Sequence, residues 1–265
     1  MLTDSLEDKY LSRIQDALNK ASAAVSAYVP GKFAVDDRGG RNVVTEADRE
    51  LSDVLRKALL RPGEGWLSEE DSDDSSRLSQ EVVWIVDPLD GTREFVDGIP
   101  EWCVSIGLAI AGTVVAGGIL NPATGERFVG GLNSGVTYNG RRVEPTRKSN
   151  LAGAVVLASR QEYKRGEWAR FEGRGFSVRA TGSVAYKLAL VAAGLADATW
   201  TLSPKHEWDV AAGVALANSA RCSVCCTQNA KLLFNQDKTL LPGLIASSTG
   251  IWHEVLEIIS PTATK

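Results

Sequence analysis

The sequence predicts an α/β protein in two parts, and three observations support this fold class. Its 265 residues correspond to between one and two domains at roughly 150 residues each. Hydrophobic residues make up 44% of the chain, which is enough to bury a sizeable core. Beyond residue 150, predicted strands alternate with predicted helices. We therefore expect an α+β part over residues 1–150 and an α/β part over residues 151–265.

The first part is expected to combine two helices with an antiparallel meander. Helical periodicity covers Leu6–Val29, and a second amphipathic run covers Thr45–Leu60. Four apolar or alternating runs follow, with glycine-containing turns between them, as in a meander. These strands are expected at Val82–Val86, Cys103–Ala111, Thr113–Leu120 and Glu126–Gly130. Asn139-Gly140 is a turn signal, and the polar segment Arg141–Asn150 after it marks the boundary between the parts.

The second part is expected to alternate strands with helices, which is typical of an α/β fold. The predicted strands are Ala154–Ala158, Ser177–Ala180, Ala198–Leu202, Ser223–Thr227 and Gly243–Ala246. The predicted helices are Ser183–Ala193, Asp209–Asn218 and Trp252–Ile259. We find no internal repeat and no long low-complexity tract in the sequence.

Charge and hydropathy exclude several classes of function. The net charge of −4 and the pI of about 5.4 disfavour a broad basic surface for duplex nucleic acid. No apolar run approaches the length of a membrane span, so we expect no membrane association. The first residues lack the basic and apolar regions of a signal peptide. We therefore expect a cytoplasmic protein.

The cysteines are expected to be structural. Cys222 and Cys225 form a C-x-x-C pair, which is compatible with zinc or redox chemistry. There is no second pair, however, and the sequence holds only two histidines, so a structural zinc site lacks ligands. The segment that includes Cys226 is better interpreted as a short β-strand with buried thiols.

The segment Trp84–Phe95 carries most of the functional information in the chain. It reads Trp-Ile-Val-Asp-Pro-Leu-Asp-Gly-Thr-Arg-Glu-Phe. The apolar run Val82–Val86 predicts a buried strand that ends on Asp87, and Asp90 follows shortly after it. Two carboxylates held rigidly at a strand end repel each other unless a cation lies between them. Their oxygens suit a hard divalent ion, above all Mg²⁺.

Gly91 and Thr92 add backbone N–H groups that can bind an anion, more so if a helix begins there. Carboxylates for a metal beside an anion site indicate phosphate chemistry. The same residues also fit an ordinary solvated turn, because Asp-Pro-x-Asp-Gly is common in turns. The apolar strand before the segment and Phe95 after it favour a buried site.

This segment resembles the signature of the inositol monophosphatase-like superfamily, the Mg-dependent, lithium-sensitive phosphomonoesterases. That signature is Trp, a short apolar gap, Asp-Pro-Ile/Leu-Asp-Gly-Ser/Thr, two variable residues and an aromatic residue. Every fixed position is met. Further segments resemble the family in order and spacing, and they are Val44–Asp48, Ser68–Glu70 and Glu207–Gly213. The resemblance implies a five-layer αβαβα sandwich with the active site between its two parts.

The resemblance also implies a site for two or three Mg²⁺ ions and a metal-activated water. Its expected metal ligands are Glu69, Asp87, Asp90, Asp209 and the carbonyl of Leu89. Asp48 and Thr92 are expected to hold the attacking water and so act as catalytic residues together with the ligand Glu69. Asp48 is also placed to contact a third, more weakly held ion.

Each of these acids also has a purely structural interpretation. Asp48 follows Thr45 by three residues, as in a capping box at the start of a helix. Asp209 precedes an alanine-rich helix and fits an N-cap. Glu69 opens an acidic run typical of a solvated loop, but it directly follows an apolar pair, as a ligand at a strand end would. The later acids of that run are assigned to solvent, and they are Asp71, Asp73 and Asp74.

The predicted substrate is 3'-phosphoadenosine 5'-phosphate, hydrolysed to AMP and phosphate. Thr92–Phe95 resembles the Thr-Lys/Arg-Glu-Phe variant typical of 3'(2'),5'-bisphosphate nucleotidases, and Glu207 before Trp208 also resembles that branch. Arg38 departs from the family, which often has a lysine there. The alternative is an inositol-1-monophosphatase or a broad sugar-phosphate phosphatase acting on fructose 1,6-bisphosphate or histidinol phosphate. A non-enzymatic binding module is disfavoured, because neither a metal ligand nor the threonine is missing.

Two further places are candidates for binding a second phosphate. Gly182-Ser183 followed by Lys187 resembles the family's glycine-serine turn, but it equally fits an N-cap with a surface lysine. Ser159 and Arg160 form another candidate contact, with a solvated arginine as the alternative. The full set of expected substrate contacts is Gly91, Thr92, Ser159, Arg160, Gly182, Ser183, Lys187 and Glu207. The expected partner is thus a small phosphorylated molecule. For the oligomeric state, both a monomer and a homodimer are compatible with the sequence.

Overall fold

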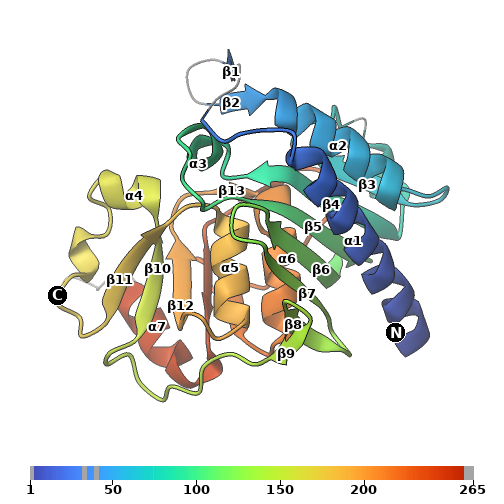
Figure 1. Cartoon of the computed structure of the whole chain (residues 1–265). Helices are drawn as coiled ribbons and strands as arrows, with labels where there is room; N and C mark the ends of the chain where they lie inside the picture. Colours follow the sequence, from blue (N-terminus) through green and yellow to red (C-terminus); the bar gives the residue numbers. More distant parts are fainter. Residues whose placement is uncertain (1–2, 32–34, 39–41, 74, 260–265) are drawn as a thin grey trace.

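The computed structural model describes residues 3–31, 35–38, 42–73 and 75–259, with backbone only for 35–38 and 42–45. Figure 1 shows helices and sheets stacked in alternating layers, which confirms the predicted five-layer αβαβα sandwich. The outer helices α1 (Asp4–Val25) and α2 (Glu46–Leu59) bury their apolar faces against β4, β5 and β6 of the first sheet.

The first sheet has seven strands in the order β3-β4-β5-β6-β7-β8-β9. Only the β3–β4 pair is parallel, and the remaining pairs form the expected antiparallel meander. The strands are β3 (Gly65–Ser68), β4 (Val82–Asp90), β5 (Cys103–Ile110), β6 (Thr113–Asn121), β7 (Glu126–Gly131), β8 (Gly135–Tyr138) and β9 (Arg141–Val143). A separate hairpin joins β1 (Val35–Arg38) to β2 (Asn42–Thr45), and η1 (Ser76–Ser79) precedes β4.

The second sheet has five strands in the order β11-β10-β12-β16-β14, with β10 parallel to both of its neighbours. Its strands are β10 (Val155–Ser159), β11 (Ser177–Thr181), β12 (Ala198–Thr201), β14 (Ser223–Cys226) and β16 (Leu244–Ser247). The short strands β13 (Lys205–His206) and β15 (Leu240–Leu241) pair separately. All first-sheet strands precede residue 150 and all second-sheet strands follow it, but two separate domains remain a prediction.

The helices α5 (Val184–Ala192) and α6 (Glu207–Ser219) fill the layer between the two sheets. The helix α7 (Trp252–Ile259) and the turn η2 (Ala169–Phe171) cover the far face of the second sheet. Three short segments complete the chain, and they are α3 (Thr92–Val96), α4 (Arg160–Lys164) and η3 (Thr249–Ile251).

Helix α6 lies unusually close to the first sheet because glycines face it. A Cβ added at Gly107 would lie 2.7 Å from the Cβ of Ala211, and one at Gly117 would lie 2.6 Å from the carbonyl of Ala212. Real Cβ atoms do not approach so closely, so only glycine permits this packing. The first turn of α6, which carries Asp209, is thereby held against the sheet.

Several sequence-based boundaries need correction. Strand β4 does not end on Asp87 but continues to Asp90, because it keeps pairing with β5 across an irregularity between these residues. Helix α6 begins at Glu207, so Asp209 lies inside its first turn and is not its N-cap. The polar segment after Gly140 includes strand β9, because three of its residues extend the meander edge.

The prediction that the acids after Glu69 are solvated is wrong for two of them. Asp71 accepts hydrogen bonds from the indole of Trp66 and the hydroxyl of Ser52. Asp73 pairs with the buried guanidinium of Arg77 at 2.6 Å. Asp74 lies outside the described residues.

The prediction for the cysteines is confirmed within the part of the chain that the structure describes. All four are free and buried, and Cys225 and Cys226 lie on β14. In the same described ranges, no helix is both long and apolar enough to cross a membrane.

Candidate active site

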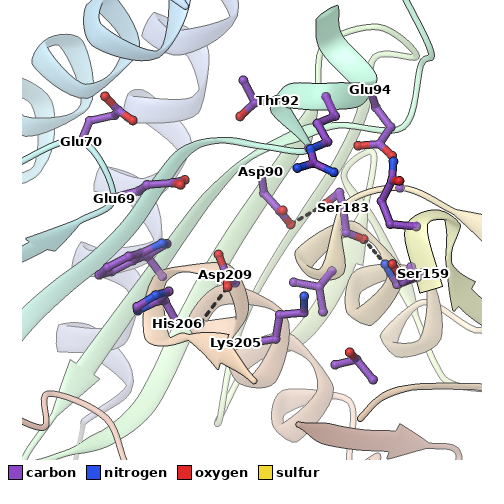
Figure 2. Close-up of a pocket in the computed structure, with 18 residues that line it drawn as sticks. Glu69, Glu70, Asp90, Thr92, Glu94, Ser159, Ser183, Lys205, His206 and Asp209 are labelled. Carbon is purple, nitrogen blue, oxygen red and sulfur yellow. Dashed lines mark hydrogen bonds between the residues drawn. The ribbon is translucent and has the colours of Figure 1, made fainter. Parts of the chain in front are cut away.

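A pocket of about 450 Å³ opens where the two halves of the chain meet. Its walls come from the end of β3, the β4–α3 turn, α4, the start of α5 and the β13–α6 junction (Figure 2). The lining residues are Glu69, Glu70, Asp90, Gly91, Thr92, Arg93, Glu94, Ser159, Gln161, Gly182, Ser183, Val184, Lys187, Thr201, Lys205, His206, Trp208 and Asp209. Segments that are far apart in the sequence thus bring predicted residues from both halves to one pocket.

The β4–α3 turn depends on a glycine. Gly91 has φ +99°, a left-handed conformation that L side chains rarely adopt, and an added Cβ would lie 3.0 Å from the carbonyl of Glu101. Thr92 follows as the first residue of α3, and its hydroxyl donates to the carbonyl of Leu89 at 3.1 Å. The predicted ligand carbonyl and the predicted catalytic hydroxyl are therefore neighbours.

Asp90 is held by the start of helix α5. Its Oδ2 accepts from the hydroxyl of Ser183 at 2.6 Å and from the backbone N–H of Ala185 at 2.7 Å. Ser183 has a positive φ of 53°, which is uncommon for a residue other than glycine. Such strained residues cluster at functional sites, where the surrounding structure fixes them. The turn therefore joins a carboxylate of the first half to a helix of the second.

Asp209 enters the pocket from the first turn of α6. Its Oδ2 accepts from the backbone N–H of His206 at 2.8 Å, and the helix dipole favours its negative charge there. The rings of His206 and Trp208 stack with their centroids 4.4 Å apart, and both residues line the pocket. Figure 2 shows His206 beside Asp209.

Two further acids lie behind the pocket lining. Asp48 and Asp87 are buried, and the Oδ1 of Asp87 accepts from the backbone N–H of Leu89 at 2.9 Å. The hydroxyls of Ser68 and Ser105 are also buried and make no hydrogen bond within the described residues. Ser68 precedes Glu69, and Ser105 pairs with Asp87 across β4 and β5. Acceptors and unsatisfied hydroxyls thus lie together in this part of the sheet.

The acids raise one another's pKa values. The side chain of Glu69 opens to the pocket, but surrounding protein desolvates it and, together with the charges of Asp209 and Asp48, raises its pKa to about 8. Burial first, and the charge of Asp90 second, raise the pKa of Asp209 to about 7. Burial and neighbouring acids likewise raise the pKa of Asp87 well above its usual range. This mutual destabilisation of charged forms is what a bound cation would relieve.

The residues present fit a hard divalent cation by composition and charge. The candidate donors are carboxylate and carbonyl oxygens, which Mg²⁺ prefers, and the anionic oxygens outnumber the nearby ammonium groups. The side chains do not form a finished ligand shell. Within the described residues, no three acidic, histidine or cysteine side chains form a group that could hold an ion. Protein donors engage Asp87, Asp90 and Asp209 instead.

The three charged residues among the predicted substrate contacts are all engaged by protein partners. Arg160 makes a bidentate ion pair with Glu101, with N–O distances of 2.6 to 3.0 Å, and it does not line the pocket. Lys187 is not a surface lysine, because it is buried and its Nζ donates to the carbonyls of Ser183 and Thr181. Glu207 is fully buried and accepts from the backbone of residues 235 and 236, outside the pocket.

Sequence reasoning missed part of the lining. Lys205 points into the pocket near Asp209 (Figure 2). Burial raises the pKa values of Asp209 and Asp90, and the charge of Lys205 offsets part of that rise. The position of Lys205 two residues before the Glu207–Gly213 motif was an available signal. The other lining residues not predicted as site residues are Glu70, Arg93, Glu94, Gln161, Val184, Thr201, His206 and Trp208.

Comparison with known proteins identifies the family. The model of the inositol monophosphatase family matches residues 7–260. The chain belongs to the inositol monophosphatase family. It is 38% identical over 192 residues to an inositol-1-monophosphatase from Mesorhizobium japonicum, covering 69% of this chain and 71% of the relative. It is 32% identical to an inositol monophosphatase from Mesembryanthemum crystallinum, covering 80% and 83%.

Solved structures agree with this assignment. The fold matches the extragenic suppressor protein SuhB from Bartonella henselae with a TM-score of 0.81 and 28% identity, over 95% of this chain and 98% of that chain. Members of the inositol monophosphatase family are phosphoric monoester hydrolases, and their substrates are small phosphorylated molecules. The resemblance of Trp84–Phe95 to this family is therefore confirmed.

The raised pKa values predict a pH-dependent stability of the metal-free protein. Unfolded Asp and Glu titrate near pH ~4, so between that pH and about 8 the folded state binds protons that the unfolded state has lost. Stability should therefore fall as the pH rises through this window. Asp209→Asn should raise the melting temperature of the chelated protein at pH 8, while Asp8→Asn on the exposed face of α1 should not. Equal effects of both variants in a thermal unfolding assay would contradict this.

The Arg160–Glu101 pair predicts a positioning role for Arg160. Glu101 also accepts from the N–H of Gly182 at 2.8 Å, so the pair fixes the turn through which Ser183 holds Asp90. Arg160→Met should lower kcat, and raise the metal concentration needed for half-maximal activity, by about tenfold. KM for substrate should change little. Arg165→Met, in the exposed pair with Glu167, is the matched control. A rise in KM alone would show that Arg160 contacts substrate.

Proposed function

We propose that the protein is a Mg-dependent phosphomonoesterase that hydrolyses inositol monophosphate. The observation that carries the proposal is the meeting of Glu69, Asp90 and Asp209 with the Gly91-Thr92 turn in one pocket. This set combines oxygen donors for a divalent cation with N–H groups for a phosphate. The names of the two relatives given above support the inositol phosphate as the substrate.

The comparisons favour this alternative over the predicted hydrolysis of 3'-phosphoadenosine 5'-phosphate. That prediction relied on the Thr92–Phe95 variant and, in addition, on groups for a second phosphate that included Arg160 and Lys187. Arg160 is instead neutralised by Glu101, and the ammonium of Lys187 is held by two carbonyls. A second phosphate would have to displace these partners, whereas inositol monophosphate needs no such displacement.

In the proposed mechanism, Glu69, Asp87, Asp90, Asp209 and the Leu89 carbonyl would hold the cations. When bound, Mg²⁺ would supply Lewis-acid stabilisation of the phosphate and lower the pKa of a water. Other residues of this chain orient the water and bind the phosphate.

The Thr92 hydroxyl and the Asp48 carboxylate orient the attacking water, and Asp48 accepts its proton. As the water oxygen bonds to phosphorus, the bond between phosphorus and the inositol oxygen breaks, and the released alkoxide takes a proton from solvent. The N–H groups of Gly91 and Thr92 face the oxygens of the phosphate and stabilise the charge that develops there. Ser183 and the first turn of α5 keep Asp90 aimed into the pocket. No covalent intermediate on the protein is required.

A phosphate-release panel tests the proposed substrate. Inositol 1-phosphate should give a higher kcat/KM than 3'-phosphoadenosine 5'-phosphate or fructose 1,6-bisphosphate. Chelation should abolish activity and Mg²⁺ should restore it. Asp90→Asn should reduce kcat by several orders of magnitude, because it removes charge from the metal site. Faster hydrolysis of the adenosine bisphosphate would overturn the substrate assignment. Activity that survives both chelation and Asp90→Asn would overturn the metal mechanism.

A double-mutant cycle tests the role assigned to Thr92 and Asp48. Because both are proposed to hold one water, Thr92→Ala should lower kcat by about 100-fold or more with little change in KM. Adding Asp48→Asn should then reduce kcat only slightly further. Fully additive losses in steady-state kinetics would show that the two residues act independently.

A further inference from the structure

A second depression, of about 610 Å³, lies at the other end of helix α6. The active-site pocket lies near α3 and β13, whereas this depression lies beside β8 and β9, at the lower end of the molecule in Figure 1. Ten residues of α6 separate Asp209 from Ser219, or about 15 Å of helix. None of the eighteen residues that line the active-site pocket also lines this depression. It is therefore a separate place on the molecule.

Its lining is strongly cationic. The charged side chains are Arg142, Arg147, Lys148, Arg221 and a single acid, Glu144. Four cations and one carboxylate give a local charge of +3, although the whole chain carries −4. A local cluster of positive charge attracts anions and raises their concentration nearby, even when the whole protein is negatively charged.

The cations gather around that single carboxylate. Glu144 pairs with Arg147 at 2.6 Å, and both side chains are largely exposed, so the ion pair is weak and open to competition. Glu144 lies in the same lining as Arg142, Arg147 and Arg221. The hydrogen bond from Arg147 and its charge lower the pKa of Glu144 most, and the charges of Arg142 and Arg221 lower it further. Among the described residues, no hydrogen bond or ion pair engages the side chains of Lys148 and Arg221.

The backbone that carries these cations is fixed before any ligand binds. Arg221 follows the C-cap of α6 with φ +63°, a position that usually favours glycine, and the N–H of Cys222 closes the motif on the carbonyl of Ala217. The hydroxyl of Thr249 donates to the carbonyl of Arg221 at 2.9 Å. An arginine therefore occupies a site where backbone preference alone selects glycine.

The segment between β9 and β10, which carries Arg147 and Lys148, is equally restrained. The hydroxyl of Thr146 donates to the buried carboxylate of Asp197 at 2.6 Å. A Cβ added at Gly250 would lie 2.1 Å from the carbonyl of Lys148, so the two loops pack in direct contact. Arg142 is anchored by a hydrogen bond to the carbonyl of Ser134. Such preorganisation lowers the entropic cost of binding.

We propose that this depression is a binding site for a small phosphate-bearing molecule with at least two negative charges. Guanidinium groups match phosphate oxygens in paired hydrogen bonds and are weakly hydrated, so arginines suit this class of anion. A multiply charged phosphate competes with Glu144 for Arg147 while it also engages Arg142, Arg221 and Lys148. The site does not depend on the proposed catalytic activity.

Inorganic pyrophosphate is the probe, titrated calorimetrically into the full-length, chelated protein at low salt. Without metal, the active-site pocket is dominated by carboxylates and repels the probe. The Arg142→Met/Arg221→Met double variant should bind at least about tenfold more weakly, because two charge-assisted contacts are lost. Glu144→Gln should bind more tightly, because the competing carboxylate is gone. Raising the salt concentration should weaken binding to the unmodified protein.

Two controls make the result specific. Arg174→Met/Arg179→Met removes the same charge from exposed residues near β11 and should leave the affinity unchanged. Lys205→Met removes a cation of the active-site pocket and should also leave it unchanged. Absence of binding to the unmodified protein would overturn the proposal. Loss of affinity in either control, equal to that in the Arg142/Arg221 variant, would also overturn it.

Discussion

Repulsion among acids that water only partly reaches is the constraint on which the site depends. Asp48 and Asp87 are buried, and Asp90 and Asp209 are half-buried beside them. Separate carboxylates in water repel only weakly, but desolvation and nearby acids raise the pKa values of Asp87 and Asp209 together. The fold must therefore hold the acids in place against their own repulsion, and it does so with hydrogen bonds from rigid elements. Helix α5 holds Asp90, and the start of α6 holds Asp209.

The layered architecture explains how the two halves share this task. The first sheet supplies Asp87 and Asp90 from β4. Asp87 is restrained within the strand by the N–H of Leu89, and Asp90 is restrained by Ser183 and Ala185 at the start of the middle helix α5. Those helices are covered by a sheet on each side, so they cannot shift without disturbing both cores. Glycines at 107 and 117 bring α6 close to the first sheet. Small residues far from the chemistry thus set the position of Asp209.

Much of the fold and of the acidic site could be predicted from the sequence because the signals are local. The apolar run before Asp87 predicts a buried strand, and the alternation after residue 150 predicts the second sheet. The Asp-Pro-Leu-Asp-Gly-Thr segment keeps its acids, glycine and threonine within a few residues, so a motif can reveal them. The glycine turn at Gly91 follows from the same stretch.

What could not be predicted depends on the tertiary packing that surrounds a residue. Arg160 has the residue type and the location of a phosphate contact, but Glu101, 59 positions earlier, neutralises it. Lys187 fits a surface helix position, yet it is buried, and the carbonyls of Thr181 and Ser183 accept hydrogen bonds from its ammonium group. Burial lowers the pKa of Lys187 to about 8, which shows how far its environment differs from a helix surface. No local pattern records the Arg160–Glu101 pair, because it forms only when the second half folds against the first. The carbonyl partners of Lys187 lie only four and six positions earlier, but its burial depends on the tertiary packing around α5.

Through its dipole, helix α6 acts on both the acidic active-site pocket and the basic second depression. Its N-terminal end, where the helix dipole is positive, faces Asp209 and the other acids. Its C-terminal end, where the dipole is negative, faces the arginines of the second depression. The same element therefore favours negative charge at one end and positive charge at the other. Because the dipole acts only within the last turn, each end needs its charged residues close by, and Asp209 and Arg221 meet that condition. Opposite charges can thus be concentrated in one chain of modest net charge without neutralising each other.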